Sequence, residues 1–436
     1  MAVLRFSSMP KAHRTFIAVL LSTTAHMAAA QFNVDINVSE SSALPAIATA
    51  HFAGEGSAPV NVTDVIRADL SRSGKFSSAD VGGLTLGMGD GVNLKQWQSQ
   101  SVVGVVAGNV TPVAGGYQVS LKLYETSKGP LGDYSLTVPA GGLRNAGHKM
   151  ADYIYEKLLG QRGAFNTRLS YVDRVNGKYK LLISDSDGDN AVAALVSNEP
   201  IISPSWSPNG SKVAYVSFEN KKPVVYIHDL PTGQRTVISD YKGNNSAPAW
   251  SPDGQTLALA LSRDGNTQVY QVAATGGSLK RLTNSQGSVI DTEPQYTPDG
   301  QQIYFTSDRG GEPQIYRMPA SGENTDVAKR VTFKGNFNTS PRISPDGTKM
   351  AFISKANGYQ THVMDLSNGD IQNLSNTSYD ESPSFAANGE VVLYSTRSNG
   401  RKVLAASSID GRMQQILSLP SGQVSAPAWG PFLDQK

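Results

Sequence analysis

The chain has 436 residues, of which 39% are hydrophobic and 17% are charged, and its formal net charge is +2. Lysine plus arginine (38) nearly balance aspartate plus glutamate (36), with no basic block or arginine stripe, so we expect no nucleic-acid partner. Cysteine is absent, which excludes disulfides, thiolate metal sites, cysteine nucleophiles and a lipidated N-terminal cysteine.

Residues 1–30 have the pattern of a secretory signal peptide. Lys11 and Arg14 precede the apolar stretch 16–21, and small residues then end at Ala30, which predicts cleavage before Gln31. The apolar stretch is too short to span a bilayer, and we expect no membrane span elsewhere. The positive residues lie unusually deep, so the sequence leaves both Met1 and Met9 open as the initiator.

Residues 31–162 carry no repeat and predict a mixed α/β domain. Residues 32–38 alternate apolar and polar side chains, as a strand does. The other expected elements are a helix capped by Asn61 or Thr63 and ending near 73–74, strands over 101–106 and 117–123 joined through 115–116, and a helix from about Leu143 to Leu159. Residues 160–163 then predict a helix stop and a short linker.

Residues 163–436 contain a phrase of the type Pro-x-aromatic-Ser-Pro-Asp-Gly that returns six times. Its first prolines lie 44, 46, 47, 42 and 44 residues apart, at Pro204, Pro248, Pro294, Pro341, Pro383 and Pro427. Pro and Gly suit the tight turn, and each turn is followed by an apolar run typical of a buried strand. A period of this size, with four short strands in each unit, predicts a β-propeller.

The two ends of the repeat region predict how the ring closes. Residues 168–196 contain three strands of a unit without the Pro-x-aromatic strand, and 427–429 supply that strand with no others after it. We therefore predict an α/β N-terminal domain followed by an all-β six-bladed β-propeller with a split first blade. Closing the ring in this way leaves no long open sheet edge.

No enzyme motif is apparent, and we predict a protein without catalytic residues, cofactor or metal. His51, His148, His228 and His362 lie far apart, and the nucleophile pattern G-x-S-x-G is missing. The run Asp185-Ser-Asp187-Gly-Asp189 suits calcium, but Asn190 and Val196 stand where a calcium loop needs glycine and glutamate. A solvated turn is favoured there, while a cation in the central channel stays open.

The residues just before the repeated prolines form the candidate binding site. They vary in charge while their neighbours repeat, and we expect them around one mouth of the channel. They are either ordinary polar loops or a ring that reads a partner, and we favour the ring because propellers commonly bind through one face. The repeated aromatic residues are expected between blades. The candidate set is Asn245, Ser246, Ala247, Asp291, Thr292, Glu293, Asn338, Thr339, Asp380 and Glu381.

The chain resembles the TolB family, the periplasmic propeller proteins of the Tol-Pal system of Gram-negative bacteria, over essentially its whole mature length. The specific matches are Asp69-Leu-Ser-Arg-Ser-Gly-Lys-Phe76 and the joining segment 155–168. Ile343 and Ala386-Ala387 depart from the repeat in two copies. The extreme N-terminal strand resembles the family only in its alternation.

The resemblance implies a non-enzymatic periplasmic scaffold that supports outer-membrane integrity and envelope constriction at cell division. It implies that the peptidoglycan-associated lipoprotein Pal binds at the propeller mouth, notably at Glu293, and we expect a monomer. It further implies that TolA binds the N-terminal strand, formed by Gln31, Phe32, Asn33, Val34, Asp35, Ile36, Asn37 and Val38. The alternative is a periplasmic carbohydrate-binding or sugar-acting propeller, which convergent acidic residues and exposed aromatics in the channel would favour.

Overall fold

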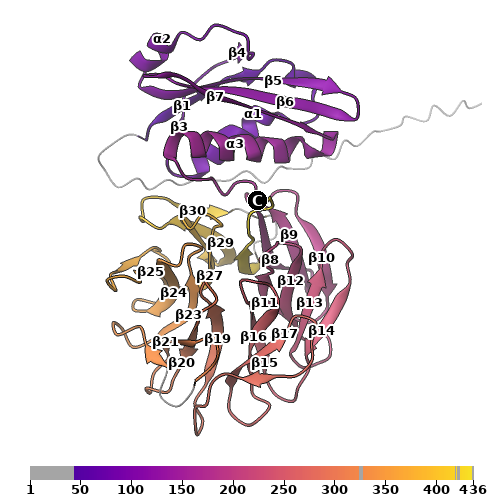
Figure 1. Cartoon of the computed structure of the whole chain (residues 1–436), viewed down its shortest axis with the longest axis vertical. Helices are drawn as coiled ribbons and strands as arrows, with labels where there is room; N and C mark the ends of the chain where they lie inside the picture. Colours follow the sequence, from indigo (N-terminus) through magenta and orange to yellow (C-terminus); the bar gives the residue numbers. More distant parts are fainter. Residues whose placement is uncertain (1–43, 324–327, 418, 420–422, 435–436) are drawn as a thin grey trace, which may run out of the picture.

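The computed structural model describes residues 44–323, 328–417, 419 and 423–434. The predicted signal segment 1–30 and the predicted N-terminal strand 31–38 lie outside the described residues. Figure 1 shows an α/β domain stacked on one side of a β-propeller, with helices α1 and α3 between the sheet of that domain and the propeller. Among the described residues, no helix is long and apolar enough to cross a membrane.

The N-terminal domain is built on a five-stranded sheet of order β3-β1-β5-β6-β7. β1 runs parallel to β3 and β5, whereas β5, β6 and β7 form an antiparallel meander. The strands of this domain are β1 (Ala46–Thr49), β2 (His51–Phe52), β3 (Ser77–Ser78), β4 (Thr85–Leu86), β5 (Val102–Val113), β6 (Gly116–Glu125) and β7 (Gly129–Val138), of which β2 and β4 pair separately. Both longer strands predicted from the sequence are therefore present.

The helices of the domain begin and end near their predicted positions. The helices and helical turns are η1 (Glu55–Ser57), α1 (Val62–Arg72), α2 (Leu94–Ser99), η2 (Ala140–Gly142) and α3 (Leu143–Leu159). Asn61 caps α1 by accepting a hydrogen bond from the backbone N–H of Asp64, as the sequence suggested. Gly160 ends α3 in the left-handed conformation, with φ 75°, which glycine adopts without steric cost.

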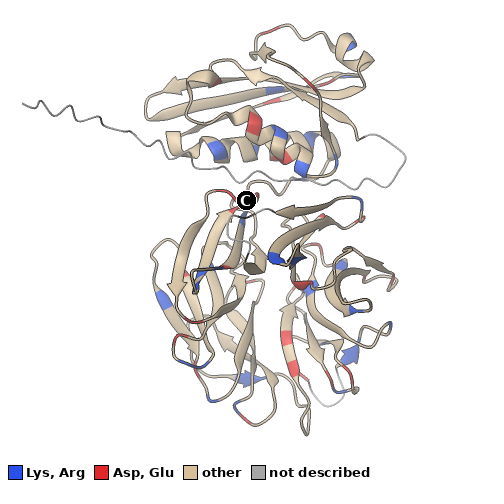
Figure 2. Cartoon of the chain, turned by 180° about the vertical axis from the view of Figure 1, so that it is seen from behind, with Lys and Arg blue, Asp and Glu red and all other residues tan. Residues whose placement is uncertain are grey.

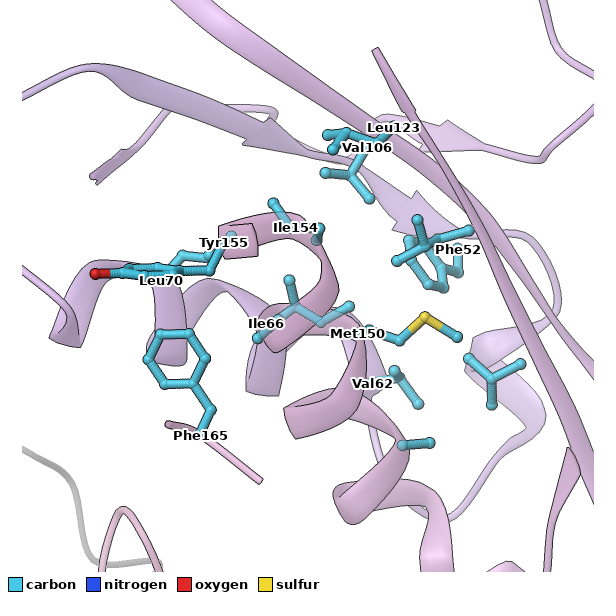
Figure 3. Close-up of a cluster of buried hydrophobic side chains, with 14 of the residues drawn as sticks. Phe52, Val62, Ile66, Leu70, Val106, Leu123, Met150, Ile154, Tyr155 and Phe165 are labelled. Carbon is cyan, nitrogen blue, oxygen red and sulfur yellow. The ribbon is translucent and has the colours of Figure 1, made fainter. Parts of the chain in front are cut away.

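The core of this domain lies where α1 and α3 pack on the sheet. Ile66 and Leu70 of α1 and Met150 and Ile154 of α3 are buried against strand residues such as Leu123 (Figure 3). The four-residue spacing within each pair places its members on one face of the helix, which explains why these segments fold as amphipathic helices.

The propeller consists of six four-stranded antiparallel sheets. The first two are β31 (Val424–Trp429), β8 (Arg168–Val175), β9 (Lys178–Asp185) and β10 (Val192–Ser197), then β11 (Ile201–Trp206), β12 (Lys212–Ser217), β13 (Val224–Asp229) and β14 (Arg235–Ser239). The next two are β15 (Asn245–Trp250), β16 (Thr256–Leu261), β17 (Gln268–Ala273) and β18 (Lys280–Arg281), then β19 (Asp291–Tyr296), β20 (Gln302–Ser307), β21 (Gln314–Pro319) and β22 (Lys329–Arg330). The last two are β23 (Asn338–Ile343), β24 (Lys349–Lys355), β25 (Tyr359–Asp365) and β26 (Ile371–Asn373), then β27 (Glu381–Phe385), β28 (Val391–Ser398), β29 (Arg401–Ser408) and β30 (Gln414–Leu417).

The ring closes through the predicted split blade. β31, the last strand of the chain, pairs antiparallel with β8, the first strand of the propeller, from Val424 opposite Asp173 to Trp429 opposite Leu169. The repeated aromatics lie between blades, as expected: the indole N–H of Trp206 donates to the Ala428 carbonyl at 3.1 Å, and that of Trp250 donates to the Ser205 carbonyl at 3.1 Å. The six-bladed fold and its split first blade are confirmed.

Every innermost strand carries a bulge at the residue before its repeated proline. The six residues share a positive φ of 49–57°, and each pairing register shifts at this point: Ser203, Ala247, Glu293, Ser340, Ser382 and Ala426. A left-handed conformation is unfavourable for a residue with a Cβ, so its sixfold repetition marks a built-in feature of the blade. The bulge places one residue of each blade on the wall of the central channel.

Candidate functional site

The mouth of the channel with the pre-proline residues lies on the propeller face away from the N-terminal domain. That domain contacts the turns after β27, β29 and β9: Gln161 donates to the Asn388 carbonyl at 3.2 Å, and the Lys75 ammonium lies 3.2 Å from Asp410. These turns are at the ends of the strands opposite to the pre-proline residues. The part of the N-terminal domain that the structure describes therefore leaves the candidate face uncovered.

Four of the predicted site residues have buried side chains, which corrects the expectation that the whole set forms a ring around the mouth of the channel. They are the first or preceding residue of an innermost strand: Asn245, Asp291, Asn338 and Asp380. The pairing register directs them into the blade, where the Asn245 amide oxygen accepts from Ser239 Oγ at 2.6 Å and Asp380 accepts from the backbone N–H of Thr361 at 2.8 Å. These side chains shape the loops at the mouth, because they satisfy backbone groups that would otherwise lack partners.

The remaining predicted residues do reach the mouth or the channel. Ser246, Thr292 and Thr339 are half-buried, and Glu381 is exposed, with its carboxylate 3.4 Å from the Lys402 ammonium. Ala247 and Glu293 line the channel. The structure thus brings these six residues to one end of the propeller, and whether they contact a partner stays a prediction.

Glu293 has a structural role that the sequence did not reveal. Its carboxylate accepts hydrogen bonds from Thr306 Oγ1 at 2.8 Å, the Ser340 backbone N–H at 2.8 Å and the Ser340 hydroxyl at 2.6 Å. Because Ser340 belongs to β23, this carboxylate joins two neighbouring blades. Substituting Glu293 would change the packing of the ring as well as the charge of the channel.

A group of exposed apolar side chains, which we term the rim, lies around the mouth and was not predicted from the sequence. Phe333 (73% exposed) and Tyr379 (59%) precede two of the innermost strands, as does Ile290 (47%). Arginine side chains lie over two of the rings, Arg330 over Phe333 at 5.3 Å and Arg397 over Tyr379 at 5.2 Å. The rim consists of Ile202, Ile290, Phe333, Tyr359 and Tyr379. For Ile290, Phe333 and Tyr379 the sequence signal is an apolar residue in the segment before an innermost strand, whereas Ile202 and Tyr359 lie on strands.

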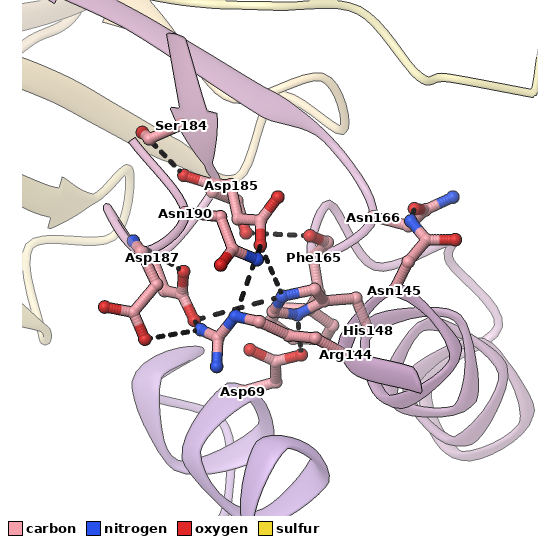
Figure 4. Close-up of polar contacts among 12 residues, drawn as sticks. Asp69, Arg144, Asn145, His148, Phe165, Asn166, Ser184, Asp185, Asp187 and Asn190 are labelled. Carbon is pink, nitrogen blue, oxygen red and sulfur yellow. Dashed lines mark hydrogen bonds and ion pairs between the residues drawn. The ribbon is translucent and has the colours of Figure 1, made fainter. Parts of the chain in front are cut away.

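A second polar cluster joins the two domains (Figure 4). Arg144 of α3 contacts all three aspartates of the β9–β10 turn: its guanidinium lies 3.2 Å from Asp185 and 2.9 Å from Asp189, and it also bonds Asp187. His148 Nδ1 lies 2.6 Å from Asp69 of α1. The sequence analysis favoured a solvated turn here, and that expectation is wrong for Asp187, which is buried between the domains.

The electrostatics of this cluster favour the charged forms of His148 and Asp69. Burial alone would lower the pKa of His148, but Asp69, supported by Asp185 and Asp187, outweighs it and raises the pKa to about 10. Burial would raise the pKa of Asp69, but His148 and Arg72 together lower it. Ligand atoms of Asp69, His148 and Asp187 lie within 4.8 Å of one another, a spacing that could hold a metal ion. Arg72 and Arg144 already contact these carboxylates, so the cluster fits an ion-pair network better than a cation site.

Charge over the described surface is mixed. Figure 2 shows lysine and arginine interspersed with aspartate and glutamate on both domains. The rim and the interdomain network are thus local features and do not belong to a surface of one sign.

Comparisons with known proteins identify the family. The sequence model of the TolB beta propeller domain matches residues 155–433, and that of the TolB amino-terminal domain matches residues 32–131. The crystal structure of TolB from Acinetobacter baumannii is similar with a TM-score of 0.84 and 39% sequence identity, over 92% of this chain and 100% of that chain. The chain belongs to the TolB family.

TolB-family membership makes the chain a component of the Tol-Pal system, as the resemblance implied. The family and the propeller fold are consistent with a non-enzymatic protein. A chain of the nidogen/laminin complex is a much weaker match, with a TM-score of 0.49 and 13% identity over 61% of this chain and 98% of that chain, and adds nothing to the assignment.

Proposed function

We propose that this TolB-family chain is a non-enzymatic, monomeric periplasmic scaffold that binds Pal at the propeller mouth and TolA through residues 31–38. Its role would be to maintain the outer membrane and to draw the envelope layers together at division. The proposed organisation is a signal peptide over 1–30, an α/β domain over 31–162 and the propeller over 163–436. The observation that carries the proposal is the apolar rim on the free face of the propeller.

The composition of the mouth is that of a protein-binding surface. Aromatic residues and arginine are enriched at the energetic centres of interfaces, and polar residues usually surround them. Phe333 and Tyr379 lie beside Arg330 and Arg397, while Ser246, Thr292, Thr339 and Glu381 supply polar groups nearby. Exposed apolar side chains gathered on one face are a known mark of an interaction site.

Removing two rim aromatics should weaken Pal binding. For Phe333→Ser combined with Tyr379→Ser, we expect the Kd for the purified Pal domain to rise by at least about tenfold, because truncating an aromatic anchor typically costs more than about 1 kcal/mol. Both side chains are more than half exposed, so the fold should be retained. Isothermal calorimetry measures the Kd.

Val192→Ser is the matched control, because Val192 is 68% exposed but lies on β10, the outer strand of its blade. It should leave the Kd unchanged. If the double variant bound Pal as tightly as the unsubstituted chain, the rim would not be the Pal site.

The proposed TolA site rests on the alternation of residues 31–38. Apolar side chains at Phe32, Val34, Ile36 and Val38 fall on one side of an extended strand, which cannot bury that side alone. Such a segment suits addition to the edge of a partner's sheet, where backbone hydrogen bonds supply affinity and alternate side chains supply specificity.

Deleting residues 31–38 should abolish TolA binding and spare Pal binding, since the two proposed sites share no residue. Mixing the shortened chain with each purified partner and measuring binding by calorimetry tests this. The combined variant Asn33→Ser and Asn37→Ser changes only the polar side of the strand and should retain most TolA affinity. Undiminished TolA binding by the shortened chain would place that site elsewhere.

The sugar-binding alternative gains no support from the channel wall. The aromatic side chains that line it, Trp206 and Phe385 among them, are buried between blades and present little stacking surface. Glu293 is the acidic residue among the lining residues of the described channel, so convergent carboxylates are missing there.

A further inference from the structure

We propose that the propeller channel contains a binding site for the carboxylate group of a small zwitterionic molecule, built around Arg342. The channel encloses a hollow of about 250 Å³, wide enough for a molecule of amino-acid size. Its charged and hydroxyl-bearing lining includes Ser203, Ser205, Glu293, Arg342, Ser382 and Ser384. This site contains none of the rim residues, and it shares Glu293 with the residues predicted to bind Pal.

Arg342 is the first reason for the inference. It lies on β23, two residues after the bulge, and its guanidinium donates one hydrogen bond, from Nη1 to the neighbouring Pro341 carbonyl at 2.8 Å. Within the described residues, its other N–H groups have no protein acceptor and no carboxylate forms an ion pair with it. Burial in the channel lowers the pKa of Arg342, and the charge of Glu293 only partly opposes this. A guanidinium in a hollow with free donors is a receptor for a bidentate anion.

The serine hydroxyls are the second reason. Those of Ser203, Ser205 and Ser382 reach no protein acceptor in the described part of the chain, although they line the hollow. Ser384 Oγ accepts from the Trp429 backbone N–H at 2.9 Å, and its own proton is free to donate. Hydroxyl donors from β11 and β27 therefore share the channel with the guanidinium, as an anion site requires.

Glu293 decides which anion fits. Its charge balances that of Arg342, so a dianion such as phosphate would meet repulsion as well as attraction. Among the described residues, Glu293 Oε1 accepts only from the Ser340 hydroxyl, at 2.6 Å, and it keeps room for one more donor. An ammonium group near Glu293 and a carboxylate on Arg342 satisfy both charges at once. A free α-amino acid has this chemistry, and so does an acidic side chain beside a lysine in an inserted protein segment.

Calorimetry with the mature chain tests the site. L-alanine and L-glutamate should bind, and acetate and inorganic phosphate should bind more weakly. In Arg342→Gln, the affinity for the amino acids should fall by at least about tenfold, because a hydrogen-bonded charge is lost. Arg317→Gln is the matched control, since Arg317 is an exposed arginine on the neighbouring blade, and it should bind as the unsubstituted chain does.

Arg342→Lys controls for a folding defect, because lysine keeps the positive charge but lacks the planar guanidinium. This variant should fold normally and bind the amino acids several-fold more weakly than the unsubstituted chain. Binding of a short acidic peptide but of no free amino acid would assign the carboxylate to a protein segment and would overturn the small-molecule proposal. Three other outcomes would also overturn it: no binding of any carboxylate, equal affinity in Arg342→Gln, or tighter binding of phosphate than of the amino acids.

Discussion

Ending the chain at Gln423 should lower the free energy of unfolding of the propeller by at least about 5 kcal/mol, because it removes the whole of β31. Val424 and Ala428 are buried in the ring, and burying each apolar side chain of this kind contributes up to a few kcal/mol. The loss of β31 also leaves β8 as an open edge strand. It removes the hydrogen bond that the Gly430 N–H donates to the Arg168 carbonyl at 2.8 Å. A loss of this size approaches the total stability of many domains.

Two further hydrogen bonds connect β31 to the rest of the propeller. The Trp429 indole N–H donates to Thr167 Oγ1 at 2.8 Å, and its backbone N–H donates to Ser384 Oγ of the preceding blade at 2.9 Å. If the truncated chain fails to fold at all, Trp429→Ala provides a second test. This variant should lower the free energy of unfolding by about 3–5 kcal/mol. Thermal and urea unfolding give the values.

A truncation after Phe432 is the matched control. This control keeps β31 and the contact between Arg162 and the ring of Phe432. Of the contacts in the described part of the chain, it removes the exposed ion pair of Arg162 with Asp434. This truncation should lower the free energy of unfolding by less than about 1 kcal/mol, because exposed ion pairs contribute little to stability. A chain ending at Gln423 that unfolded at the same urea concentration as this control would contradict closure of the ring by β31.

The architecture could be predicted from the sequence because its determinants are local. In each Ser-Pro-Asp-Gly turn, as at Ser251 to Gly254, the glycine supplies a positive φ of 69° and the serine hydroxyl bonds the aspartate at 2.6 Å. Such chemistry recurs wherever the turn recurs, so the period predicts the blades. The split blade followed from one surplus strand at the C-terminus and one missing strand near residue 168.

The orientation of the mouth residues could not be predicted in the same way. Alternation along a strand normally separates the two faces, but the bulge at the residue before each proline shifts the register by one step. Asp291 and Asp380 therefore turn into the blade, while Glu293 enters the channel. The residue type at the bulge does not predict its left-handed conformation, because serine, alanine and glutamate all occupy this position.

The interdomain network was equally hidden from the sequence. Asp69 and His148 are 79 residues apart and meet only when α1 packs on α3. Arg144 and Asp187 are 43 residues apart and meet only when the two domains dock. The aspartates of the β9–β10 turn looked like a weak calcium loop because they do surround a cation. That cation is the guanidinium of Arg144.

Replacing His148 by glutamine should lower the free energy of unfolding of the chain by about 3–5 kcal/mol, since removing one partner of a buried ion pair leaves the other charge uncompensated. Asp69 would lose its 2.6 Å contact, and Asp185 and Asp187 would lose a neighbouring positive charge. Calorimetric unfolding measures the effect on both domains. Asp410→Ala is the control at the same interface, because the partly exposed pair of Lys75 with Asp410 should contribute no more than about 1 kcal/mol.

The pH dependence of the difference in unfolding free energy between the unsubstituted chain and His148→Gln shows whether His148 stabilises the fold through its charge or through packing alone. The folded-state pKa of about 10 lies above the ordinary value of 6.5, so protonated His148 stabilises the folded state. That contribution is fully present below pH 6.5 and is lost as the pH rises through 10. The stability difference between the unsubstituted chain and His148→Gln should therefore be largest near pH 6 and shrink steadily towards pH 10. A difference that stayed constant over this range would mean that His148 acts through packing alone, and the ion-pair account of the docked domains would fail.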